Sequence, residues 1–366
     1  MPVPPPCRSP GPATRFRMNL HPHSLARGIV LSVAVLFPVH PGLAQASADP
    51  PYPPPGRLVD IGGWRLHLNC AGTAVAGQPV VVLEAGIGAF SVEWDLLQPR
   101  VAPFARVCSY DRAGVGWSEL GPAPRTRHQM VFELHTLLEK AGERPPYLLV
   151  GQSFGGSVVR LYASVYRSEV AGMVLVDTGH LTGVSNINGE LVRLAERSTG
   201  RPIPAPLASN PFRESDLAPS VRAQIEAAAR QAASMANEPP RNKLPAESQR
   251  MRVWALSQVK HYVAHFNPFD SEELALMVAE QDRKPHPFGD LPLVVLSRGT
   301  PAHTGESQWI EDERVKGQAA LVNLSSKGRQ VIATGSGHHI QIEDPELVVS
   351  AIREVLAAAQ AQGGRR

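Results

Sequence analysis

The fold of this chain is decided by residues 147–156, which read Tyr-Leu-Leu-Val-Gly-Gln-Ser-Phe-Gly-Gly. The residues before the first glycine are apolar and predict a short buried strand, and residues 157–164 predict a helix. A strand, a tight Gly-x-Ser-x-Gly turn and a helix form a nucleophile elbow, in which the serine is exposed at a strained bend. Gly151 and Gly155 suit this turn because a Cβ atom at either position would crowd it. The stretch therefore predicts that Ser153 is a nucleophile.

Short apolar runs and helical patterns alternate on both sides of this stretch. The alternation predicts an α/β fold with an open, mostly parallel sheet and helices on both faces. Strand-like runs are absent from residues 180–285, whose helical stretches predict a helical lid over the carboxyl ends of the strands. Further strands are predicted at 57–61, 64–69, 80–83, 106–110, 172–176, 291–296 and 330–333, and helices at 126–139, 219–235, 246–266, 271–280 and from Pro345 onward.

The charge distribution argues against nucleic acid as a partner. The chain of 366 residues has a formal charge of +3, but residues 1–46 hold four of its 36 basic residues and none of its 33 acidic ones. The remainder is close to neutral and has no basic patch. No phosphate-binding loop or dinucleotide fingerprint occurs, so the sequence predicts no cofactor.

The first 46 residues are expected to be a signal peptide. An apolar run at 28–37 is too short to span a bilayer comfortably, and Ala44-Gln45-Ala46 is a small-x-small cleavage site. Cleavage after Ala46 predicts a secreted or periplasmic protein with no stable membrane span, and an uncleaved anchor is the alternative. The expected order is then a Pro-rich linker (47–56), a core in two parts (57–178 and 289–360) around the lid (179–288), and a disordered tail (361–366).

A serine hydroxyl needs a base to remove its proton, and His338 is the best candidate among 13 histidines. It follows the strand predicted at 330–333 through a glycine-rich loop and precedes the last helix, whereas His339 is expected to point elsewhere. His261 and His265 are four residues apart on a predicted helix, a spacing that can hold a metal ion. Because no third ligand is evident, we expect no metal and two solvated lid histidines.

Together with these features, the segment Tyr110-Asp111-Arg112-Ala113-Gly114-Val115-Gly116-Trp117-Ser118 makes the chain resemble the α/β-hydrolase superfamily over residues 57–357, apart from the lid. The resemblance implies an eight-stranded sheet with the lid inserted after the sixth strand. It also implies a Ser–His–acid triad with an oxyanion hole, and structural roles for Asp111 and Arg112. Cys70 and Cys108 would lie on the second and fourth strands, which are neighbours in this fold. A disulfide is therefore expected, with two buried thiols as the alternative.

The acid of the triad is not where many members of the superfamily carry it. Residues 297–303, which follow the strand at 291–296, contain no carboxylate. Members similar to haloalkane dehalogenases place the acid where Asp177 lies, at the end of the strand at 172–176. Its role would be to hold the imidazole tautomer and stabilise the imidazolium. Asp177 is the first choice, and the alternatives are Glu306, Glu311 and Asp312.

The resemblance implies two backbone donors for the oxyanion of a tetrahedral intermediate. One is the amide of Phe154, the residue after the nucleophile. The other comes from residues 84–88, where Ala85-Gly86 replaces the His-Gly of many relatives. Ile87 is the preferred donor and Gly88 the second choice.

These features predict a serine hydrolase that cleaves a carboxylic ester or another small acyl substrate through an acyl-enzyme intermediate. One alternative is an aminopeptidase similar to proline iminopeptidases, whose lid supplies acids for the free amine of the substrate. Glu214, Glu226 and Glu272 are the candidate acids in this lid. A non-catalytic binder on the same scaffold is the other alternative. The sequence leaves the acyl chain length and the oligomeric state open.

Overall fold

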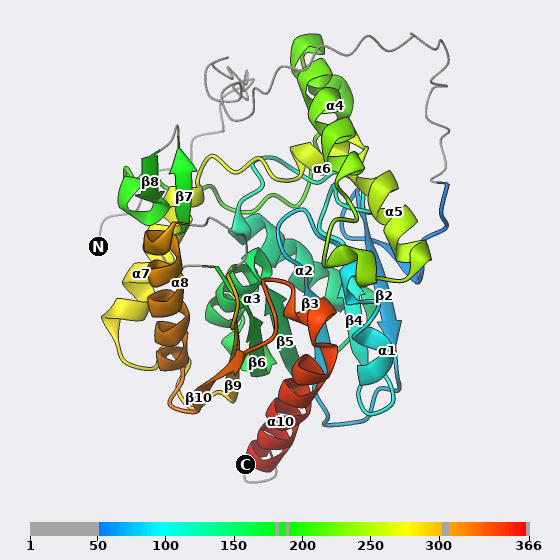
Figure 1. Cartoon of the computed structure of the whole chain (residues 1–366). Coiled ribbons are helices and arrows are strands. Elements are labelled where there is room, and N and C mark those ends of the chain that lie inside the picture. Colours follow the sequence, from blue (N-terminus) through cyan, green and yellow to red (C-terminus); the bar gives the residue numbers. More distant parts are fainter. Residues whose placement is uncertain (1–50, 180–182, 188–189, 302–306, 364–366) are drawn as a thin grey trace, which may run out of the picture.

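The computed structural model describes residues 51–179, 183–187, 190–301 and 307–363, whose arrangement is shown in Figure 1. The expected signal peptide with its cleavage site at Ala46 lies outside these residues, as does Glu306. Within the described ranges, no helix combines the length and the apolar character that a membrane crossing requires.

An eight-stranded sheet forms the centre of the molecule, with the strand order β1-β2-β4-β3-β5-β6-β9-β10. β2 pairs antiparallel with β1 and β4, and all other neighbours are parallel. The predicted fold class, a mostly parallel eight-stranded sheet, is therefore confirmed. The strands are β1 (Arg57–Asp60), β2 (Arg65–Ala71), β3 (Val80–Glu84), β4 (Val107–Tyr110), β5 (Tyr147–Gln152), β6 (Val170–Val176), β9 (Leu293–Arg298) and β10 (Gly328–Ala333).

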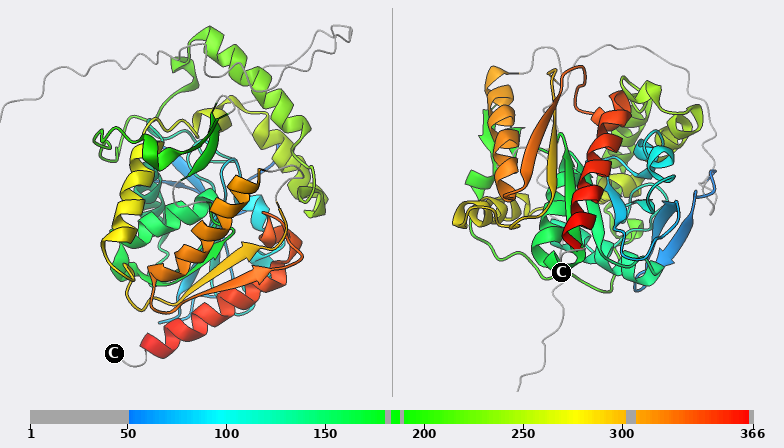
Figure 2. Two further views of the ribbon diagram at one scale, coloured as in Figure 1. Left: turned by 60° about the vertical axis from the view of Figure 1, so that its left-hand side comes forward. Right: turned by 90° about the horizontal axis from the view of Figure 1, so that it is seen from below.

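Helices cover both faces of this sheet (Figure 2). Val80 and Val82 of β3 pack in one buried cluster with α2 and α3, and Val81 and Leu83 pack in a second cluster with α1 and α10. Both faces of the strand are buried, which is why its sequence is a continuous apolar run rather than an alternating one. These helices are α1 (Gln98–Val101), α2 (Arg127–Ala141), α3 (Phe154–Val165) and α10 (Pro345–Gly363).

The insertion, residues 179–288 between β6 and β9, holds four α-helices and a small hairpin in its described part. The expectation that strands are absent here is wrong, because β7 and β8 pair antiparallel. Each is only four residues long, too short for a clear alternating pattern. The helix expected at 246–266 is broken at Gln258, whose backbone is extended (φ −91°, ψ 139°), so that α5 ends before it and α6 begins after it. The elements are β7 (Val184–Ile187), β8 (Glu190–Arg193), α4 (Pro219–Ser234), α5 (Ala246–Leu256), α6 (Val259–Val263) and α7 (Asp270–Arg283).

Two helical segments near the C-terminus differ from the sequence prediction. α8 (Gln308–Ala320) was not predicted, because its buried residues are Arg314 and Gln318 and its inward face therefore has no apolar periodicity. α10 continues to Gly363, so the first residues of the expected disordered tail are helical. The short helix α9 (Ile340–Glu343) lies between β10 and α10.

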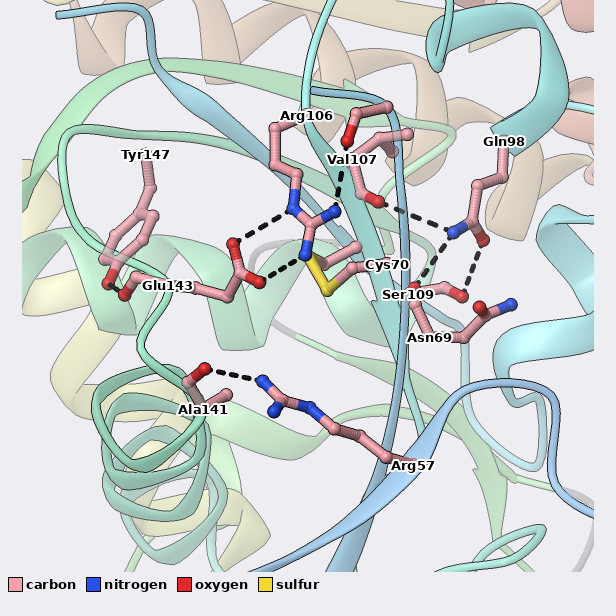
Figure 3. Close-up of a disulfide and its surroundings, with 12 residues drawn as sticks. Arg57, Asn69, Cys70, Gln98, Arg106, Val107, Ser109, Ala141, Glu143 and Tyr147 are labelled. Atoms are coloured by element: carbon pink, nitrogen blue, oxygen red, sulfur yellow. Dashed lines mark hydrogen bonds and ion pairs between the residues drawn. A yellow bond between two sulfur atoms is a disulfide. The ribbon is translucent and has the colours of Figure 1, made fainter. Parts of the chain in front are cut away.

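A disulfide joins Cys70 of β2 to Cys108 of β4, as the resemblance implied (Figure 3). The two cysteines are direct partners in the antiparallel register of these strands. Beside them, the Arg106 guanidinium donates to a carboxylate oxygen of Glu143 over 2.6 Å and to the Gly72 carbonyl over 3.0 Å. The disulfide therefore joins two strands that their ladder and the Arg106–Gly72 hydrogen bond already hold together, and the Arg106–Glu143 ion pair ties them to the loop before β5.

Removing this disulfide is expected to lower the free energy of unfolding by about 2–5 kcal/mol. The two cysteines are 38 residues apart, and a cross-link of that span restricts the unfolded chain. Urea unfolding of the Cys70→Ala/Cys108→Ala variant, compared with the oxidised wild type, measures the difference. Reduced wild type is the control and should unfold near the midpoint of the variant. Equal midpoints for the variant and the oxidised wild type would contradict the prediction.

Candidate active site

Ser153 stands at a sharp bend between β5 and α3. Its φ of 52° lies in the left-handed region, and its amide donates to the Val176 carbonyl over 3.0 Å. A Cβ atom at Gly155 would meet the backbone oxygens of Glu84 and Ala85, so only glycine fits behind the bend. This is the strand, bend and helix geometry that the sequence predicts for the serine.

His338 connects Ser153 to Asp177 through two hydrogen bonds. Its Nε2 is 2.9 Å from the Ser153 Oγ, and its Nδ1 is 2.6 Å from the Asp177 Oδ2. His338 lies in the loop after β10, and Asp177 follows the last residue of β6. The Nδ1 of His339 lies 3.9 Å from the Glu93 carboxylate instead. The structure thus brings together the three residues that the sequence singled out as serine, base and acid.

Asp177 is held as a carboxylate by several donors. It is 1% exposed, and its Oδ1 accepts hydrogen bonds from the Gln318 Nε2 (2.6 Å) and the Arg298 amide (3.1 Å). Burial by itself raises the pKa of the Asp177 carboxyl, but its bonds to His338, Gln318 and the Arg298 amide leave that pKa below its usual value. Asp177 is therefore ionised at neutral pH and accepts the Nδ1–H of His338.

Two of the alternative acids, Glu311 and Asp312, lie in the described part of the chain, and both bind side chains other than His338. Glu311 accepts hydrogen bonds from the guanidinium groups of Arg298 (3.2 Å) and Arg314 (2.8 Å). Asp312 is exposed and pairs with the side chain of Gln308 over 2.9 Å. Neither contacts His338, so Asp177 is the acid beside the imidazole in the described part of the chain.

Two glutamines that the sequence analysis did not assign support this array. The Gln152 Nε2 donates to the His338 carbonyl over 3.1 Å, so the residue before Ser153 also holds the histidine loop. Gln318 reaches Asp177 from α8. Gln152 could have been found from its place inside the Gly-x-Ser-x-Gly pattern, whereas nothing in the sequence near Gln318 marks it.

The loop of Gly86, Ile87 and Gly88, here called the oxyanion loop after the role that the sequence analysis expects of it, packs against the bend. A Cβ atom on Gly86 would lie 3.4 Å from the Cβ of Ser153. The Arg112 guanidinium donates to the Ala85 and Gly86 carbonyls over 2.6 and 2.5 Å. The Arg112 side chain also pairs with the buried Glu84, so its role here is structural.

The amides of Ile87 and Gly88 differ in their partners. Gly88 donates to the Nε2 of His265 over 3.0 Å. The Ile87 amide makes no hydrogen bond to any residue that the structure describes, and its side chain is 60% exposed. Ile87 and Gly88 are the two candidates for the second oxyanion donor. The Ile87 amide is therefore the one of the two that remains available to a substrate oxygen.

Asp111 lies away from this array. It is fully buried, and its carboxylate accepts hydrogen bonds from the amides of Ser91 (2.8 Å) and Trp117 (3.0 Å). The same carboxylate lies 3.0 Å from the His67 Nδ1. Burial alone raises its pKa, but His67 and the two amides keep the pKa of Asp111 below its usual value. These contacts are those of a structural residue, as the resemblance implied.

The expectation that His261 is a solvated lid histidine is wrong. Its side chain is 3% exposed and lies over the oxyanion loop, where a Cβ atom on Gly88 would be 3.7 Å from the His261 Nε2. His261 and His265 have ring centroids 5.1 Å apart. In the described ranges, one group of residues has ligand atoms close enough for a metal ion, Cys70, Cys108 and Glu143, and its two sulfurs are bonded to each other.

Comparisons with known proteins agree with this fold. Residues 78–199 match the family model described as alpha/beta hydrolase fold. An AB hydrolase superfamily protein of Gibberella zeae is 26% identical over 294 residues, which cover 76% of this chain and 86% of that protein. Other curated relatives match over shorter stretches, and the chain spans only 18% of the length of one and 38% of another.

Two solved structures illustrate the likeness in fold. A thermophilic esterase from Thermogutta terrifontis has a TM-score of 0.51 at 20% identity, with 81% of this chain and 94% of that chain covered. The enol-lactonase from Burkholderia xenovorans LB400 has a TM-score of 0.54 at 16% identity, with 82% and 100% covered. The family match over residues 78–199, the strand order and these likenesses show that the chain has the α/β-hydrolase fold.

Proposed function

We propose that this protein is a serine hydrolase that cleaves a carboxylic ester of a small molecule through an acyl-enzyme intermediate. One observation carries the proposal. The Ser153 hydroxyl, the His338 imidazole and the Asp177 carboxylate form one hydrogen-bonded chain, with links of 2.9 and 2.6 Å. By accepting the Nδ1–H, Asp177 leaves the Nε2 of His338 free to take the serine proton. Similar folds occur in an esterase and an enol-lactonase.

The proposed reaction has two halves. The Ser153 Oγ attacks the acyl carbon while His338 takes the hydroxyl proton, and the carbonyl electrons move onto the oxygen. Collapse of this intermediate breaks the ester bond, and the leaving alkoxide takes the proton from His338. Water then attacks the acyl-enzyme, gives its proton to His338, and releases the carboxylic acid as Ser153 regains its proton.

Two amides are proposed to donate to the oxyanion in both halves. Phe154 is the first residue of α3, so its amide has no partner within the helix and lies at the positive end of the helix dipole. The Phe154 ring is held near the guanidinium groups of Arg112 and Arg127, whose Cζ atoms lie 5.5 and 4.8 Å from its centroid. Ile87 supplies the second amide. Donors fixed before the reaction stabilise the developing charge without a cost of reorganisation.

The aminopeptidase alternative is less well supported by the insertion. Glu214 and Glu226 both pair with Arg222, at 2.9 and 3.6 Å, and Glu272 pairs with Arg201 at 3.1 Å. An acid that already has an arginine partner is poorly placed to bind the free amine of a peptide. A non-catalytic binder is also disfavoured, because such a protein has no need of the complete hydrogen-bonded chain.

The protein is expected to hydrolyse p-nitrophenyl butyrate and not proline p-nitroanilide. When hydrolysis of the acyl-enzyme is the slow step, we also expect a burst of one p-nitrophenol per chain before the steady state. Stopped-flow absorbance measures the burst, and a series of acyl chain lengths then defines the pocket. Turnover of proline p-nitroanilide with no ester hydrolysis would favour the aminopeptidase, and binding of the ester without any turnover would favour a binder.

The same proposal includes an exported protein whose insertion acts as a lid. The disulfide between Cys70 and Cys108 is of a kind that persists in oxidising compartments. In Figure 1, α4, α5 and α6 lie together at one end of the sheet. His265 of the insertion contacts the oxyanion loop, which places part of the insertion beside the array.

A further inference from the structure

The oxyanion loop is held from two directions. The Gly86 carbonyl accepts hydrogen bonds from Arg112 (2.5 Å) and from the Ala89 amide (3.2 Å). This carbonyl belongs to the same planar peptide unit as the Ile87 amide, so the two bonds fix one end of that unit. The next peptide unit carries the Gly88 amide, which donates to the Nε2 of His265 over 3.0 Å.

Glycine on both sides of Ile87 makes these bonds necessary. Gly88 has a φ of +66°, a conformation that glycine adopts at no steric cost but does not by itself favour. Without outside partners, the peptide units on either side of Ile87 could rotate. The direction in which the Ile87 amide points therefore depends on the hydrogen bonds of its neighbours.

His265 is suited to this contact as a neutral imidazole. It lies in the insertion just after α6, 177 residues from Gly88 in sequence. Burial, and then the electrostatic interactions with His261 and Arg112, hold the pKa of His265 well below the usual value, although a hydrogen bond to the His261 backbone opposes the shift. The proton of the neutral ring is then on Nδ1, and the Nε2 lone pair is free to accept the Gly88 amide.

We propose that His265 is a positioning residue for the oxyanion hole: by accepting the Gly88 N–H, it lets the insertion hold the neighbouring Ile87 amide toward the oxygen of the tetrahedral intermediate. This inference rests on the proposed function. It assigns the insertion a part in the chemical step, in addition to covering the substrate. His265 itself touches neither the substrate nor Ser153 in this role.

Two variants that remove the acceptor test the proposal. These variants are His265→Ala and His265→Phe, and the phenylalanine keeps a ring at the site. Both are expected to lower kcat for p-nitrophenyl butyrate roughly ten- to a hundredfold, because misplacing a group that acts in the transition state costs up to about a hundredfold in rate. KM should stay within about twofold, since the ground-state ester does not need the oxyanion donors. His265→Gln restores an acceptor and should recover most of the rate. His286→Asn, an exposed histidine of the same insertion, is the matched control.

The affinity for a transition-state analogue distinguishes a positioning role of His265 from a merely structural one. A trifluoromethyl ketone forms a tetrahedral adduct with a serine, so its affinity should fall in the variants by the same factor as kcat/KM. An active wild type whose His265→Ala and His265→Phe variants keep kcat, or lose only thermal stability, would overturn this inference alone. A folded wild type with no esterase activity would overturn the proposed function, and the inference with it.

Discussion

Replacing Ser153 by alanine is expected to lower kcat for p-nitrophenyl butyrate by roughly 10⁶-fold, the order of magnitude seen when a serine nucleophile is removed. The variant loses the Ser153 hydroxyl, whose oxygen lies 2.9 Å from the His338 Nε2 and is the proposed nucleophile toward the acyl carbon. Labelling by a fluorophosphonate, which phosphonylates an activated serine, should disappear together with turnover. Intact mass spectrometry after labelling and a steady-state assay measure the two losses.

The fold of this variant should be unchanged, because alanine has the same Cβ as serine and meets no additional strain at φ 52°. Its melting temperature is therefore the internal check. Ser350→Ala is the matched control, since Ser350 is exposed on α10 and its hydroxyl donates to the Glu346 carbonyl of its own helix. That variant should keep both labelling and rate. A Ser153→Ala protein that still takes up one label per chain would show that another residue is the nucleophile.

The residues that could be predicted share a local signal. The central strands appear as continuous apolar runs because both of their faces are buried, as in β3. Ser153 carries a motif that requires a strand before it and a helix after it, and the structure has β5 and α3 there. His338 follows from its position between a strand and the last helix. Asp177 was chosen by resemblance, and its contact with His338 is a matter of tertiary structure.

The residues that could not be predicted act across long distances in the chain. Gln318 supports Asp177 from 141 residues away, on a helix whose inward face is polar and therefore shows no apolar periodicity. His265 reaches Gly88 from the insertion, where packing rather than pattern decides which face of a helix is buried. Polar contacts of this kind have no fixed spacing in sequence. The fold and the serine and histidine of the proposed triad can therefore be predicted from sequence more readily than the residues that orient them.

The Asp177→Asn variant is expected to lose about 10⁴-fold in kcat with little change in stability or KM. An asparagine of the same size keeps an oxygen that can accept the Gln318 side chain and the Arg298 amide, both of which now donate to the Oδ1 of Asp177. Its other terminal atom is then an NH₂ group, which faces the Nδ1 of His338 as a donor. The imidazole must turn a lone pair toward it and carry its proton on Nε2, where it can no longer accept the proton of Ser153. The assay with p-nitrophenyl butyrate, together with thermal unfolding, measures both quantities.

Asp312→Asn is the matched control, because Asp312 is an exposed carboxylate that the sequence left as an alternative acid. It should retain the wild-type rate, and Glu311→Gln should affect stability through Arg298 and Arg314 more than it affects the chemical step. The size of the loss at Asp177 also separates two roles for this carboxylate. If it only packed the end of β6, the asparagine variant would keep its rate, since the donors around Oδ1 would still be satisfied. A large loss of kcat in a stable protein requires instead that Asp177 determines which nitrogen of His338 carries the proton.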